Sequence, residues 1–105
     1  MNPIAKKALR EALRLLKRAE DALIGRDPDA EDISKAVHYT KALILAASDD
    51  PGAALSRSML READAFLGVI ALAMRVPDQN LPSLVGMSVI ACRVFVRNAL
   101  KVSRA

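Results

Sequence analysis

The chain has few of the residues on which metal binding, disulfide bonding and most catalytic chemistry depend. Among its 105 residues there is no Trp, one Cys (Cys92), one His (His38), one Tyr and two Phe. A single cysteine excludes an intramolecular disulfide. Cys92 and His38 together cannot supply the four ligands of a structural zinc site, so no metal site is expected.

The chain also lacks the short motifs that identify large enzyme families. It has no Gly-rich phosphate loop, no HExxH pair of metal ligands, and no Ser, His and Asp in an order known from hydrolases. The sequence therefore favours a protein that is not an enzyme.

Neither a secretion signal nor a membrane span is recognisable. The first residues, MNPIAKKALREAL, carry scattered charges and contain no apolar core of the kind found in secretory signals. The uncharged stretch Ala65–Met74 has ten residues, well short of the roughly 20 that cross a bilayer. We therefore expect a cytoplasmic protein without a membrane partner.

Alanine and leucine are abundant, and they favour helix over strand. Hydrophobic residues make up 52% of the chain. An Asx-Pro pair opens three apolar-periodic runs, at Asn2, Asp27 and Asp50; the Asx side chain accepts from first-turn N–H groups, and proline fits the first helical position. Short connections favour an up-down-up-down four-helix bundle, with two stacked helical hairpins, α-solenoid-like, as the alternative. The pattern predicts one all-α domain, residues 1–105, with helices at about 3–24, 28–48, 51–76 and 81–103.

The spacing of apolar residues indicates which face of each helix is buried. In the second helix the expected core stripe runs along Ile33, Val37, Thr40 and Ile44. His38 lies off this stripe, between two lysines, and is expected to face solvent. The stretch Ala65–Met74 is apolar on all sides and is expected to be covered by the rest of the chain. In the first helix the expected stripe is Ile4, Ala8, Ala12, Leu15, Ala19 and Leu23, and it is broadened by Leu9, Leu13 and Leu16.

The first half of the chain has idealised helix sequences, KKALREALRLLKRAEDAL and DPDAEDISKAV. With their Asx-Pro starts and Ala/Leu pattern, residues 1–55 resemble a computationally designed (de novo) helical bundle or helical-repeat protein. The second half departs from that style, because it has Gly68 and Gly86 inside helices and also contains Met87 and Cys92. The resemblance implies an engineered scaffold without a natural activity, and no natural family is recognised.

The net charge of +4 comes entirely from the second half, because residues 51–105 carry seven basic and three acidic side chains, whereas residues 1–50 carry nine of each. Four cations near the C-terminus share one helix face: Arg93, Arg97, Lys101 and Arg104. Cations are favoured there by the helix dipole alone. We expect this face to be solvated, and a nucleic-acid partner is not expected.

Three features are candidates for a site. His38 is the residue on which a catalytic, haem-binding or metal-ligating role would depend, although exposure without a role is the favoured interpretation. Asp64 and Arg93 are lone charges beside apolar runs and are expected to pair, as a structural ion pair rather than a catalytic one. Gly68 and Gly86 predict close approach of the third and fourth helices, with a ligand-filled cavity as the alternative.

Three functions remain open at this point. The first is an engineered scaffold that binds a small apolar ligand or cofactor of unknown identity in its core. The second is a module that self-associates or binds a partner through the apolar surface of the third and fourth helices. The third is a designed catalyst or haem binder that uses His38.

Overall fold

The four predicted helices are present in the computed structural model, which describes residues 1–24, 30–75 and 81–102. None of the described residues forms a strand. The third predicted helix differs in its first turns, which form a 3₁₀ helix rather than an α-helix. The elements are α1 (Pro3–Ile24), α2 (Ala30–Ser48), the 3₁₀ helix η1 (Pro51–Ser56), α3 (Arg57–Ala73) and α4 (Leu81–Val102).

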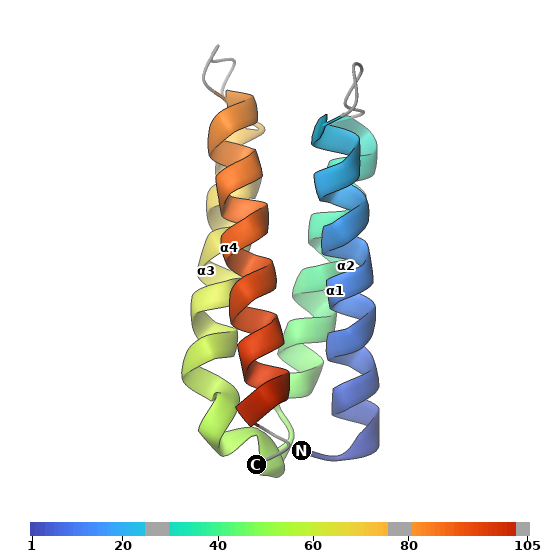
Figure 1. The fold of residues 1–105 in the computed structure, drawn as a ribbon, viewed down its shortest axis with the longest axis vertical. Coiled ribbons are helices and arrows are strands. Elements are labelled where there is room, and N and C mark those ends of the chain that lie inside the picture. Colours follow the sequence, from blue (N-terminus) through green and yellow to red (C-terminus); the bar gives the residue numbers. More distant parts are fainter. Residues whose placement is uncertain (25–29, 76–80, 103–105) are drawn as a thin grey trace.

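The helices form a four-helix bundle made of two antiparallel hairpins, α1–α2 and α3–α4 (Figure 1). Contacts join α1 to α2, α2 to α3, α3 to α4 and α4 to α1, so the helices close into a ring. The molecule is elongated, with extents of 41 × 19 × 19 Å. The start of α1, the end of α4 and η1 lie at the same end of the bundle.

Asx side chains cap two of the helices, as the sequence predicts. The Asn2 carboxamide oxygen accepts from the backbone N–H of Ala5 at 2.8 Å, and Asp50 Oδ1 accepts from that of Gly52 at 3.2 Å. Asp50 Oδ2 also accepts from the backbone N–H of Asn2 at 2.7 Å, which ties the start of α1 to the start of η1. This bond lowers the pKa of Asp50. The third predicted start, at Asp27 and Pro28, lies outside the described residues.

Side chains from all four helices fill the centre of the bundle. The predicted α2 stripe is confirmed, because Ile33, Val37, Thr40 and Ile44 are all buried. The largest fully buried apolar side chains are Leu9, Leu16, Ile44, Leu60, Leu67, Ile70, Val89 and Val96. The core is therefore built mainly from Leu, Ile and Val, with alanines between them.

Two core predictions need correction. The buried side of α1 is centred on residues that were expected only to broaden the stripe: Leu9 and Leu16 are buried together with Ala5, Ala12 and Ala19, whereas Ile4 is 81% exposed. Because α1 has apolar residues on both sides of its buried face, periodicity alone placed the centre of the predicted stripe too close to the side of Ile4. The stretch Ala65–Met74 is covered on its inner side only, since Val69 and Leu72 stay exposed.

Gly68 and Gly86 do not mark close helix contacts, contrary to the sequence-based prediction. A Cβ atom added at either glycine would meet nothing within 4 Å outside its own helix. The space at Gly68 opens on a groove between α2 and α3.

Gly68→Ala is expected to raise the free energy of unfolding by up to about 1 kcal/mol, because alanine loses less backbone entropy in a helix and finds free space here. Chemical denaturation measures the change. Gly52→Ala is the contrast, since its Cβ would lie 2.7 Å from the Met1 backbone nitrogen, and no gain is expected. Loss of stability in Gly68→Ala would mean that a helix does approach Gly68 closely.

Candidate functional site

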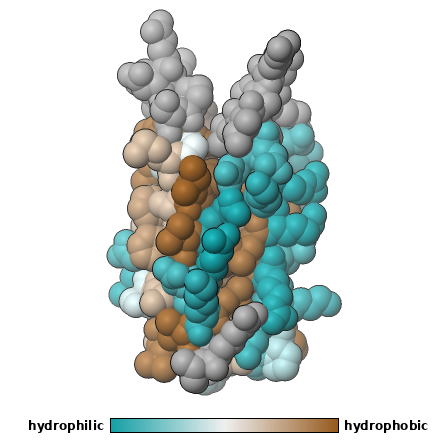
Figure 2. Space-filling view, viewed as in Figure 1, coloured by the Kyte–Doolittle hydropathy of each residue, from teal (hydrophilic) through white to brown (hydrophobic). Residues whose placement is uncertain are grey.

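The outer surface of the α3–α4 hairpin is apolar and exposed. On α4, Leu84, Met87, Ile90 and Val94 recur at spacings of three and four residues, so they share one side of the helix. We call this surface, with Val69 and Leu72 of α3, the α3–α4 apolar face. In the space-filling view hydrophobic residues predominate on the side of the molecule where α3 and α4 lie, whereas the α1 side is hydrophilic (Figure 2).

The α3–α4 apolar face is as large as the largest apolar patch on a typical monomer. Its six side chains are each 40–71% exposed. Together they expose roughly 500 Å², within the range of about 300–600 Å² for the largest apolar patch on typical monomers, which is often functional. Neither Ala65–Met74 nor Leu81–Cys92 contains a charged residue, so no charge interrupts the face over these two segments.

Aromatic residues join the two helices behind this face. Phe66 of α3 and Phe95 of α4 stack with ring centroids 5.8 Å apart and an interplanar angle of 24°. Both side chains are half-buried. The stack holds α3 and α4 together and so fixes the relative position of the apolar residues on either side.

His38 is exposed, as the α2 periodicity predicts. Its ring makes an edge contact with Tyr39, with centroids 5.8 Å apart and an interplanar angle of 67°. His38 lines the groove between α2 and α3, together with Lys41 on the same helix. Within the described chain no group of three or more His, Cys, Asp and Glu side chains is placed to hold a metal ion.

The predicted pairing of Asp64 with Arg93 is wrong. Arg93 instead forms an ion pair with Glu20 of α1, and both side chains are about four-fifths buried. Asp64 Oδ1 and Arg93 Nε are buried without a hydrogen-bond partner, as is the Thr40 hydroxyl. The three candidate site residues therefore do not converge: Arg93 faces α1, whereas His38 lies in the groove between α2 and α3.

Cys92 is fully buried beside α3. Its thiol donates to the backbone carbonyl oxygen of Ala63 across a distance of 3.4 Å. Burial, and secondarily the charge of Asp64, raises the pKa of the Cys92 thiol from 9.0 to about 12. A thiol with this pKa is a poor nucleophile at neutral pH, so Cys92 is a packing residue.

The cations near the end of α4 do not form one solvated face. Arg93 is ion-paired with Glu20, whereas Arg97 and Lys101 are exposed. Arg104 lies outside the described residues. Nucleic-acid binding would usually need a denser basic surface than two exposed cations.

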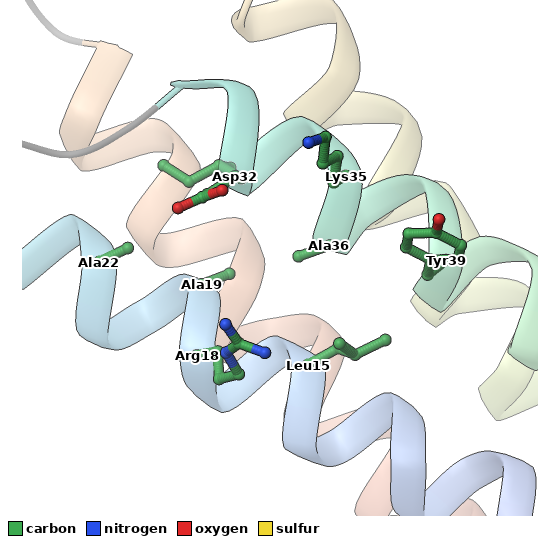
Figure 3. A pocket seen from close by; sticks show the side chains of 9 residues that line it. Leu15, Arg18, Ala19, Ala22, Asp32, Lys35, Ala36 and Tyr39 are labelled. Atoms are coloured by element: carbon green, nitrogen blue, oxygen red, sulfur yellow. The ribbon is translucent and has the colours of Figure 1, made fainter.

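A groove of about 320 Å³ lies between α1 and α2 (Figure 3). Ala19 and Ala22 of α1 and Ala36 of α2 give it small side chains on both walls. Charges of both signs surround it, from Arg18, Asp32 and Lys35, and Tyr39 lies at one end. This mixture of charges favours no particular ligand.

Sequence reasoning missed the partner of Arg93 and the α2–α3 groove. Glu20 lies 73 residues from Arg93 in the chain, and no local pattern connects the two. The glycine at position 68 was the available signal for the groove, because small residues on a helix face leave space as readily as they permit contact.

Three comparisons with known proteins gave no match: no family model, no curated protein and no solved structure matches the chain. No helix in the described ranges is long and apolar enough to cross a membrane.

Proposed function

We propose that this chain is an interaction module that pairs with a second copy of itself through the α3–α4 apolar face. The observation that carries the proposal is the exposure of six large apolar side chains on one hairpin. The described residues of the α1–α2 hairpin, by contrast, present mainly charged and polar side chains to solvent. The α1 side of the molecule is correspondingly hydrophilic in Figure 2.

The size of the face supports a weak dimer. Two copies that cover one another's face would remove roughly 1,000 Å² of surface in total, which is near the lower limit for a specific interface. A two-fold symmetric arrangement is the commonest one for such pairs, because it brings the same patch of each copy together.

The test is the mass in solution over a wide concentration range, measured by sedimentation equilibrium. The unchanged protein is expected to shift from monomer to dimer as its concentration rises. The double variant Leu72→Lys and Met87→Lys should weaken dimerisation at least tenfold, because it would bury two charges in each copy.

The control variant is Ile4→Lys with Leu55→Lys. These two side chains are 81% and 80% exposed and lie outside the α3–α4 apolar face, so the control adds the same charge at positions that are at least as exposed. It should dimerise as the unchanged protein does. A chain that stays monomeric at all concentrations, or a control that loses dimerisation equally, would refute the proposal.

The other two functional hypotheses, a small apolar ligand in the core of an engineered scaffold and a haem-binding or catalytic His38, stay predictions.

A further inference from the structure

The groove between α2 and α3 is a second surface with distinct chemistry. Its volume is about 310 Å³, at the lower end of the roughly 300–1,000 Å³ typical of ligand pockets. The α2 wall consists of Ser34, Val37, His38 and Lys41, and the α3 wall of Leu67, Gly68, Ala71, Met74 and the following residue Arg75.

The floor of this groove is apolar and open. Val37 and Leu67 are core residues that form its base. On the α3 side, Gly68 and Ala71 have no or small side chains and so leave the groove open. At one end the Ser34 hydroxyl lies 3.9 Å from the Met74 sulfur, so this contact crosses from one helix to the other. The result is a short apolar channel with one end bridged.

The rim of the groove is basic. His38, Lys41 and Arg75 are all exposed, and none of the nine lining residues is acidic. Elsewhere in the described chain, four cations have carboxylate partners: Arg14, Lys17, Lys35 and Arg93. Lys41 and Arg75 have no carboxylate within ion-pair distance among the described residues.

Asp64 is the acidic group closest along α3, one turn before Gly68. It is not part of the lining, and its Oδ1 atom is buried. An anion in the groove is therefore favoured at the exposed rim rather than at the base. Arg75 follows Met74 at the bridged end of the groove, whereas His38 and Lys41 lie further along α2, so a single carboxylate would lie beside His38 and Lys41.

We propose that the α2–α3 groove binds a small amphipathic carboxylate, with its alkyl chain on the apolar floor and its carboxylate at the basic rim. An unbranched alkyl carboxylate such as decanoate matches the groove in polarity and charge, because its chain can cover the apolar floor while its carboxylate lies at the basic rim. This site is separate from the α3–α4 apolar face and does not depend on dimerisation.

Sodium decanoate is the probe, and the binding assay is ¹⁵N NMR titration of the unchanged protein. Chemical-shift changes are expected at positions 34–41 and 67–75. Decanol, which lacks the charge, and acetate, which lacks the chain, should each bind at least tenfold more weakly. Equal binding of decanoate and decanol would refute the role of the basic rim. Shifts concentrated on positions 84–94 would place the ligand on the wrong surface and refute the proposal.

Two variant pairs test the site directly. Gly68→Leu fills the groove and should weaken decanoate binding at least tenfold, whereas Gly86→Leu adds the same side chain to equally free space on α4 and should not. Lys41→Glu should weaken binding similarly, whereas Arg61→Glu, an exposed α3 position outside the lining, should leave it unchanged. Circular dichroism checks that each variant folds, and Gly68→Ala is a milder block with a smaller expected loss. Full decanoate binding by folded Gly68→Leu protein would overturn the proposal.

Discussion

Leu60→Ala is expected to lower the free energy of unfolding by about 2–5 kcal/mol. Leu60 is 0% exposed and lies in the first turn of α3. Its truncation removes apolar contacts and leaves a cavity that the close-packed core can only partly fill. For a domain of this size, whose total stability is of the order of 5–15 kcal/mol, that loss is large.

Leu72→Ala on the same helix is the matched control. Leu72 is 66% exposed, so its truncation should change the stability of the monomer by no more than about 0.5 kcal/mol. Both variants are compared by urea denaturation at low protein concentration, where dimerisation does not contribute. Similar losses in the two variants would mean that the inner and outer faces of α3 are assigned wrongly.

Native Cys92 is expected to react with iodoacetamide at least a thousandfold more slowly than the same thiol in denaturant. The rise of its pKa from 9.0 to about 12 lowers the thiolate population at pH 8 roughly a thousandfold. Burial, the main cause of the shift, also blocks access of the reagent. A native rate within tenfold of the unfolded rate would show that Cys92 is accessible.

The same shift makes stability depend on pH. Above pH 9 the unfolded thiol ionises, whereas the folded thiol keeps its proton up to about pH 12. The unfolded state is then favoured as the pH rises, so the contribution is fully present below pH 9 and is lost above it, by up to about 1.4 kcal/mol per pH unit. Cys92→Ala should lack this component of the slope, and the difference between the two proteins isolates it because all other titratable groups are the same. Identical slopes would contradict the raised pKa.

Local pattern was enough to predict the helices and the buried side of α2. That helix has one clear apolar stripe, and the lysines at 35 and 41 border His38, so its register could be read directly. In α1 the apolar residues are spread more widely, and the choice between Ile4 and Ala5 as the inward position depends on where α2 and α4 pack. That information is tertiary and is absent from a single helix.

The candidate site was predictable only in part. The apolar surplus of the last two helices predicted exposed apolar surface, and the structure places it on the outside of one hairpin. The contacts of Arg93 and the free space at Gly68 could not be predicted, because each depends on the distance between helices far apart in sequence. A lone charge shows that a partner is needed without showing which helix supplies it.

The ion pair between Glu20 and Arg93 has a consequence for the order of folding. Each hairpin can form from contacts that are close in sequence, whereas this pair closes a loop of 73 residues and joins one hairpin to the other. Local contacts form before distant ones because their entropic cost is smaller. The pair is therefore expected to form late in folding, after the transition state. Weakening it should then raise the unfolding rate and leave the folding rate nearly unchanged.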